Sequence, residues 1–248
     1  MVSIGRCRAT PSGANARNRA RTGAMRTGIC VGLLGGSFNP AHGGHRRISL
    51  FARDALGLDE VWWLVSPGNP LKPAQGMAPL AARLAAATRE ARRAPIRATA
   101  IEAVLGTRHT IDTVRALKRR YPRNRFVWLM GADNLAQFHR WRAWREIARA
   151  MPIAVLARPG YDGAALASPA MAWLRRYRVP PASLRNGSKS GGKWSAPALV
   201  ILRFDPDPRS ATAIRRADPD WASGYSALST RDPVTLRLVG AVREPTTP

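Results

Sequence analysis

The sequence predicts an α/β fold, a doubly wound parallel sheet with helices on both faces, and two observations lead to it. From residue 28 onward, short apolar runs alternate with longer amphipathic segments. The apolar runs are continuous rather than alternating, which is typical of parallel strands buried on both faces. We therefore expect a single domain whose ligands bind beyond the carboxyl ends of the strands.

The expected elements follow the chain in order. Strands are expected at 30–34, 61–65, 96–101, 126–130, 153–157 and 199–202. Helices are expected at 43–56, 79–93, 110–120 and 132–150. The segment 159–197 carries prolines, glycines and a polar run. There we expect one short helix near 169–176, followed by a flexible loop over about 180–197.

A strong positive charge distinguishes the composition. The 248 residues include 40 Lys and Arg against 15 Asp and Glu, a net charge of +25, and all but four of the basic residues are arginine. Such a surface favours anionic ligands and could bind nucleic acid. The arginines are spread through every segment, however, which favours a soluble enzyme with many solvated arginines and weighs against nucleic acid as the partner.

Other features bear on where the protein acts and where its domain begins. No apolar run approaches the roughly 18 residues of a membrane span, and two cysteines are too few for a disulfide framework or a zinc site. We therefore expect a cytoplasmic protein with no membrane partner.

Residues 1–24 hold five arginines and no acidic residue. They lack the apolar core of a secretory signal, although their composition resembles an organellar transit peptide. We expect a basic disordered tail or an upstream start codon here, and a domain over 25–248.

The most informative segment is 35–45, which reads Gly-Gly-Ser-Phe-Asn-Pro-Ala-His-Gly-Gly-His. It lies between an expected strand and an expected helix, and a glycine turn at such a junction lets backbone N–H groups face a phosphate. His42 and His45 add side-chain donors for the same anion. We expect this segment to hold a triphosphate and to stabilise charge on it.

Two further blocks follow expected strands. In Ser-Pro-Gly-Asn-Pro-Leu-Lys-Pro, residues 66–73, the prolines stiffen a loop that presents Lys72, a suitable point charge for a phosphate. In residues 106–113, Thr110 or Asp112 could cap a helix. The exposed N–H groups at such a helix start also suit a carboxylate.

The remaining two blocks lie farther along the chain. Asp133 comes just after an expected strand, where a carboxylate can accept hydrogen bonds from ribose hydroxyls. Trp141 could stack on a flat ring or pack in the core. In residues 210–215, hydroxyls, free N–H groups and Arg215 form a second candidate phosphate site.

The order of these five blocks resembles that of the nicotinate-nucleotide adenylyltransferases, in the nucleotidyltransferase superfamily with the His-x-Gly-His signature. The resemblance covers about residues 29–216. Segment 35–45 looks like the family's first motif, and 67–72, which reads Pro-Gly-Asn-Pro-Leu-Lys, looks like its loop of two prolines and a lysine. The other three motifs match Thr110 to Thr113, Gly131 to Asp133 with Trp141, and Ser210 to Arg215.

The resemblance implies a Rossmann-like nucleotidyltransferase fold and an activity in NAD biosynthesis. ATP and nicotinate mononucleotide would give nicotinate adenine dinucleotide and pyrophosphate, with Mg²⁺ bound through the ATP phosphates. The implied catalytic residues are His42, His45 and Arg215. The implied ATP contacts are Gly35, Gly36, Phe38, His42, His45, Gly131, Asp133, Ser210, Thr212 and Arg215. The implied contacts with the second substrate are Ser37, Lys72, Thr110, Trp141 and Arg158.

Some positions depart from the family pattern, and some alternatives stay open. Asn39 stands where relatives often carry Asp, Ala211 replaces a serine, and His109 occupies a place often held by Tyr. The acceptor could instead be nicotinamide mononucleotide or phosphopantetheine, although the block at 106–113 argues against the latter. A basic nucleic-acid-binding protein is the alternative from another class. The oligomeric state, including a homo-oligomer, is open.

Overall fold

The computed structural model describes residues 28–68, 76–157, 163–189, 194–204, 210–225 and 229–240. In these ranges a parallel sheet has the strand order β3-β2-β1-β4-β5-β6. Its strands are β1 (Cys30–Gly36), β2 (Glu60–Val65), β3 (Ile96–Thr99), β4 (Arg125–Gly131), β5 (Ile153–Ala157) and β6 (Leu199–Arg203). The strand order reverses between β1 and β4, and ligands of open α/β sheets bind at such a switch point.

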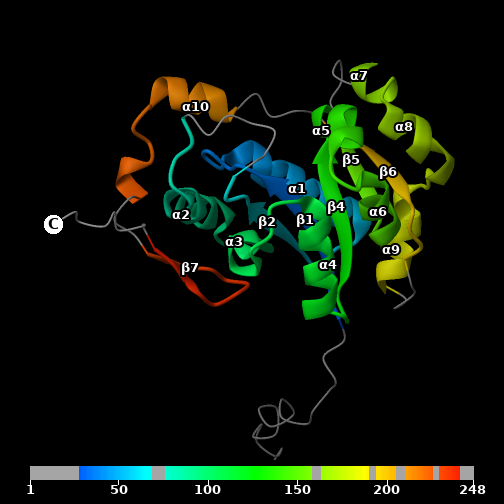
Figure 1. Cartoon of the computed structure of the whole chain (residues 1–248), viewed down its shortest axis with the longest axis horizontal. Helices are drawn as coiled ribbons and strands as arrows, with labels where there is room; N and C mark the ends of the chain where they lie inside the picture. Colours follow the sequence, from blue (N-terminus) through cyan, green and yellow to red (C-terminus); the bar gives the residue numbers. More distant parts are fainter. Residues whose placement is uncertain are drawn as a thin grey trace, which may run out of the picture.

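Helices cover both faces of this sheet (Figure 1). One face carries α1 (Gly43–Leu56), α2 (Leu80–Ala91) and α9 (Pro181–Lys189). The other face carries α3 (Ile101–Leu105), α4 (Thr110–Arg120), α5 (Ala132–Gln137), α6 (Trp144–Ala150), α7 (Gly163–Leu166) and α8 (Pro169–Leu174). The doubly wound α/β domain expected from the sequence is confirmed.

The strands divide their side chains between two hydrophobic cores. Within β1, Val31 and Leu33 pack into one core while Cys30 and Leu34 pack into the other, because successive side chains of a strand point to opposite faces. All residues of β5 are buried. Burial on both faces is therefore the reason that the strands read as unbroken apolar runs.

Three expected elements differ in the structure. The expected strand 96–101 stops at Thr99, because the Thr99 hydroxyl accepts a hydrogen bond from the Ile101 N–H and α3 starts there. The expected helix 132–150 is split into α5, a 3-10 turn η1 (Phe138–Arg140) and α6. The split lies where Ala143 adopts a left-handed φ of 49°, which a continuous helix does not allow.

The third difference concerns the expected loop over 180–197, which begins with α9. The side chain of Leu184 is buried in the core on the α1 side of the sheet, and the Trp194 indole N–H donates to its carbonyl. Burial of this apolar face explains why a polar stretch is helical. The short helix expected near 169–176 is present as α8 and the 3-10 turn η2 (Arg175–Tyr177).

The C-terminal part of the chain packs beside α2 and α3. It contains α10 (Ala211–Ala217), η3 (Ser223–Tyr225) and the antiparallel pair β7 (Thr230–Arg231) and β8 (Leu238–Val239), with α10 and β7 on the α2 side in Figure 1. The fully buried Asp232 accepts hydrogen bonds from the Thr99 hydroxyl and the Ala100 N–H, both at 2.8 Å. It also accepts from the N–H groups of Val234 and Thr235. Asp232 thus attaches the C-terminal segment to the end of β3.

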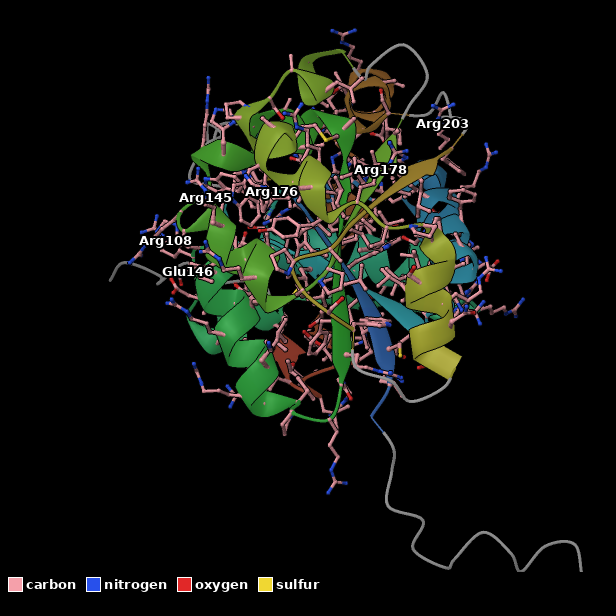
Figure 2. All side chains as sticks on the ribbon, turned by 90° about the vertical axis from the view of Figure 1, so that its right-hand side faces the viewer. Arg108, Arg145, Glu146, Arg176, Arg178 and Arg203 are labelled. Carbon is pink, nitrogen blue, oxygen red and sulfur yellow. The ribbon has the colours of Figure 1, made fainter. Side chains whose placement is uncertain are left out.

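The arginines lie over much of the surface. Figure 2 shows Arg108 and Arg145 toward one edge of the molecule and Arg203 toward the other. The Arg145 guanidinium lies 4.4 Å from the ring centroid of Trp144, and Arg176 lies 5.8 Å from that of Trp173. The chain's own guanidinium groups thus cover aromatic rings in this region. These arginines therefore pack within the protein, which weighs against the interpretation that the rings form a surface on which nucleic-acid bases stack. No helix of the described ranges is long and apolar enough to cross a membrane.

Candidate active site

The turn between β1 and α1 carries a histidine pair with a defined geometry. His42 is the N-cap of α1, and its Nδ1 accepts a hydrogen bond from the Gly44 N–H at 3.1 Å. The Nδ1 of His45 accepts in turn from the His42 N–H at 3.2 Å. The two histidines therefore form a capping box, with imidazoles in the places usually taken by Ser or Thr and Glu.

This capping box determines which nitrogen of each neutral ring carries the proton. An Nδ1 that accepts a backbone hydrogen bond has no proton, so the proton of a neutral imidazole lies on Nε2. The two rings lie together, with centroids 4.0 Å apart, and both are half-buried. In the neutral rings the donor nitrogen of each histidine is therefore Nε2, at the switch point of the sheet where the sequence predicts an anion site.

Beneath the histidines lies Phe38, whose side chain is buried. Its ring centroid is 4.9 Å from that of His45 and 5.2 Å from that of Trp63. Its backbone adopts a left-handed φ of 46°, which is rare for a residue other than glycine. A contact between Phe38 and a nucleotide would therefore use its backbone rather than its ring.

Asn39, one of the departures from the family pattern, has a structural role that needs an amide. Its Nδ2 donates to the Gly76 carbonyl at 2.9 Å, and its Oδ1 accepts from the Ala78 N–H at 3.2 Å. A carboxylate could accept the second bond but could not donate the first. Asn39 thus links the turn after β1 to the segment that leads into α2.

The block 210–215 is brought to the same turn. Arg215 donates one hydrogen bond to the Asn39 carbonyl and another to the Thr212 hydroxyl, the latter at 3.3 Å. Ser210 is the N-cap of α10 and accepts from the Ala213 N–H at 3.1 Å. The tertiary structure therefore places the second predicted phosphate site against the first, although 164 residues lie between the two blocks.

A cavity of about 320 Å³ opens next to this turn. It lies beyond the carboxyl ends of β1 and β2, at the start of α4 and along the segment from α5 to α6. Its lining residues are Gly35, Gly36, Ser37, Ser66, Gly68, Glu102, Arg108, His109, Thr110, Trp128, Asn134, Gln137, Arg140, Trp141 and Arg142. The predicted residues Ser37, Thr110 and Trp141 thus meet in one cavity.

The indole ring of Trp141 both packs in the core and lines the cavity. The ring packs edge-on against Trp128 and Phe138, at centroid distances of 6.1 and 5.3 Å. It is only half-buried and also lines the cavity. Core packing therefore holds one flat ring at the cavity wall.

The start of α4 differs from expectation in one respect. Neither Thr110 nor Asp112 is the N-cap, because His109 has that position and makes no side-chain cap hydrogen bond. Thr110 is instead the first helical residue and faces the cavity. Asp112 lies 3.7 Å from Arg115 and 3.9 Å from Arg142, so its carboxylate takes part in surface ion pairs.

Sequence reasoning missed Glu102, which also lines the cavity. Its Oε1 accepts from the Thr113 hydroxyl at 3.1 Å, and that hydroxyl lies 2.9 Å from the hydroxyl of Thr107. Burial raises the pKa of Glu102 to about 7, and hydrogen bonds from Thr113 and Ser66 oppose this rise. One signal was available, because a single acid in the apolar helix Ile101–Leu105 directly follows a strand.

Asp133 lies at the same edge of the sheet but is exposed and outside the cavity lining. It belongs to the first turn of α5, whose N-cap is Gly131. A Cβ on Gly131 would lie 2.3 Å from an Asp133 carboxylate oxygen, so a side chain at position 131 would displace that exposed carboxylate. Lys72 and Arg158 lie outside the described residues. Among the described residues, no group of three or more His, Cys, Asp or Glu could hold a metal ion.

Comparison with known proteins identifies the family. A family model described as cytidylyltransferase-like matches residues 33–217. The probable nicotinate-nucleotide adenylyltransferase of Erythrobacter litoralis is 69% identical over 89% of this chain and 99% of its own. That of Bradyrhizobium sp. is 51% identical over 78% of this chain and 98% of its own. The chain belongs to the nicotinate-nucleotide adenylyltransferase family.

Solved structures of adenylyltransferases have the same fold. Plasmodium falciparum nicotinic acid mononucleotide adenylyltransferase complexed with NaAD has a TM-score of 0.53 and 13% identity, covering 76% of this chain and 83% of its own. The same protein complexed with APC has a TM-score of 0.52. The family and the Rossmann-like fold implied by the sequence resemblance are confirmed. So is membership in an enzyme family of adenylyl transfer.

Proposed function

We propose that this chain joins ATP and nicotinate mononucleotide to form nicotinate adenine dinucleotide and pyrophosphate. One observation carries the proposal. The turn between β1 and α1 begins at Ser37, which lines a cavity together with Thr110 and Trp141, and it ends at the histidine pair at the start of α1. A donor phosphate at the histidines and an acceptor in the cavity would therefore meet across one turn. The 69% identity to an adenylyltransferase supports the same reaction.

Catalysis of this reaction requires that the two substrates are positioned and that the charge developing on the ATP phosphates is stabilised. An oxygen of the acceptor's 5′-phosphate attacks the α-phosphorus of ATP, a new P–O bond forms, and the bond to the bridging oxygen of pyrophosphate breaks. A phosphate monoester is already an adequate nucleophile, so no general base is required. The Nε2–H groups of His42 and His45 would donate to the ATP phosphates, and His45 would stabilise the developing charge.

The other ATP contacts come from two sides of the turn. Ser210, Thr212 and Arg215 would hold the phosphates, because Arg215 already reaches the Asn39 carbonyl. Gly131 and Asp133 would receive the adenosine ribose, and the backbones of Gly35, Gly36 and Phe38 would border the phosphates. Mg²⁺ would arrive bound to the ATP phosphates. We place the reaction in the cytoplasm, and a homo-oligomer is compatible with the proposal.

The cavity suits the acceptor. Trp141 would stack on the pyridine ring, while Thr110 and the first N–H groups of α4 would bind its carboxylate. Ser37 and Lys72 would hold the 5′-phosphate, with Arg158 near the nucleotide. The volume of about 320 Å³ lies at the lower end of ligand pockets.

The decisive experiment offers nicotinate mononucleotide and nicotinamide mononucleotide separately, with ATP and Mg²⁺, and identifies the dinucleotide formed. We expect strong preference for the nicotinate acceptor. Equal use of both would contradict the acceptor assignment, and no transfer to either would contradict the reaction. Omission of Mg²⁺ in the presence of a chelator is expected to abolish transfer.

A pair of variants tests the role of Trp141. Trp141→Ala is expected to raise the KM for the acceptor, because the stacking surface is lost. Trp173→Ala is the matched control, since Trp173 is also half-buried but lies outside the cavity lining. Equal effects of the two substitutions on the acceptor KM would contradict the role of Trp141.

A further inference from the structure

Arg83 is a fully buried cation beneath the site. Its side chain lies in α2 and is 1% exposed. Its Nη1 donates to the carbonyls of Ser37 and Ser66, each at 2.7 Å, and its Nε donates to the Ala78 carbonyl at 2.8 Å. Among the described residues no carboxylate forms an ion pair with it, so its partners are backbone carbonyls alone.

Burying a guanidinium without a carboxylate partner costs desolvation free energy, which its hydrogen bonds must offset. Burial lowers the pKa of Arg83 to about 10, so the guanidinium stays charged at neutral pH. The neighbouring positions of α2 are mostly alanine and leucine, and an apolar side chain of similar volume would avoid the desolvation. What an apolar side chain could not do is bind three carbonyls from three segments at once.

The three carbonyls define what Arg83 holds together. Ser37 directly follows β1, Ser66 directly follows β2, and Ala78 leads into α2. The Ser66 N–H also donates to the Gly36 carbonyl at 3.0 Å, which continues the pairing of β1 with β2. Arg83 thus cross-links the ends of two adjacent strands at the edge where the cavity opens, and both serines line that cavity.

The bond to Ser37 also controls the following residue. The Ser37 carbonyl belongs to the planar peptide unit that ends at the Phe38 nitrogen, so its direction helps to set the φ of Phe38. That φ is 46°, a conformation that persists in a residue other than glycine only when its surroundings hold it. Among the described residues, the side chain that donates a hydrogen bond to this carbonyl is that of Arg83. It therefore holds the turn that leads to His42 and His45.

We propose that Arg83 is a positioning residue for adenylyl transfer, which holds the histidine turn and the cavity wall in register through backbone carbonyls. This inference rests on the proposed function. Because the Arg83 side chain is buried, Arg83 does not touch either substrate and acts through the backbone that follows β1 and β2. The donor site and the acceptor cavity meet at this backbone, and a small shift there would misalign the two reacting phosphates.

Two substitutions separate positioning from stability. Arg83→Met fills the space without a charge or a donor, and it is expected to lower kcat about 10- to 100-fold in a folded protein, the scale of a misplacement near 1 Å. Arg83→Lys keeps the charge, but a single ammonium cannot span all three carbonyls in the same geometry. We expect it to restore part of the lost kcat relative to Arg83→Met.

Leu84→Ala is the matched control. Leu84 is the next residue of α2, is fully buried, and packs in the core rather than on the strand ends. It is expected to lower the melting temperature while leaving kcat and both KM values within about twofold. A merely structural role for Arg83 predicts the same pattern for Arg83→Met, so this pattern in both variants would overturn the proposal.

A substrate-free measurement keeps the test independent of the proposed function. Hydrogen–deuterium exchange of the free protein is expected to be faster over residues 36–41 in Arg83→Met than in the unmodified chain, and unchanged there in Leu84→Ala. An inactive unmodified chain would refute the proposed function alone, and exchange would then decide whether Arg83 holds the turn. Unchanged exchange over 36–41 in Arg83→Met would refute the positioning role.

Discussion

Replacing Glu102 with glutamine should remove a pH dependence that the structure predicts for stability. Burial raises the pKa of this carboxyl from 4.5 to about 7. Between these values the folded chain retains a proton that the unfolded chain has released. The folded state therefore binds more protons, and the free energy of unfolding falls as the pH rises through this window.

The magnitude follows from the size of the shift. A difference of about 2.5 pKa units corresponds to about 3 kcal/mol at 1.36 kcal/mol per unit, which is an upper estimate for a carboxyl that keeps some contact with solvent. We expect this contribution to be complete below pH 4.5 and lost above pH 7. Glu102→Gln keeps an oxygen that can accept from the Thr113 hydroxyl, but its amide does not ionise.

The assay is urea unfolding of both chains at pH 5, 6, 7 and 8. The difference between the two free energies of unfolding should change by about 2–3 kcal/mol in favour of Glu102→Gln as the pH rises. Parallel pH profiles would refute the reasoning, because Glu102 would then titrate alike in the folded and unfolded states.

The same substitution should alter substrate binding. An ionised Glu102 in the cavity opposes an anionic acceptor, so the acceptor KM is expected to rise above pH 7 and to rise less in Glu102→Gln. The other charged or titratable residues of the cavity lining are Arg108, His109, Arg140 and Arg142. His109→Gln is the control, because His109 is the imidazole that also lines the cavity.

Three further predictions concern catalysis, packing and the N-terminal segment. His45→Ala is expected to lower kcat by roughly 10²–10³ because a charge-stabilising donor is lost, and steady-state kinetics with near-normal turnover would contradict it. Asp232→Ala is expected to lower the free energy of unfolding by about 2–3 kcal/mol, because buried donors at Thr99 and Ala100 lose their acceptor; an unchanged chemical denaturation midpoint would show that this contact is dispensable. A chain that starts at Met25 is expected to keep the full kcat/KM, and an inactive or insoluble product would show that residues 1–24 belong to the functional protein.

The parts of this protein that sequence patterns predicted are those whose causes are local. The strands were recognisable because burial on both faces selects continuous apolar residues. The histidine turn was recognisable because strand end, glycine turn and helix start lie within one short segment. Even the tautomer of His45 is a local matter, since its Nδ1 accepts from a backbone N–H three residues away.

Two of the expected elements were wrong for reasons that residue types do not reveal. Helix α9 lies in a polar stretch, and what stabilises it is the burial of Leu184 against the sheet. The split between α5 and α6 depends on the left-handed Ala143, a conformation with no signature in the residue type. Local propensity does not contain the burial that each segment acquires in the folded chain.

Arg83 and Glu102 show most clearly what tertiary structure decided. In a chain rich in arginine, nothing marks Arg83 from its neighbours, and its carbonyl partners Ser37 and Ser66 lie 46 and 17 residues away. Glu102 acquires its raised pKa only when packing removes water from its carboxyl. The sequence alone determined the strands of the sheet, the starts of α1, α4 and α5, and the chemical groups at the strand ends. The folded core decided which charges lose their water, because desolvation depends on everything packed around a group and not on its neighbours in the chain.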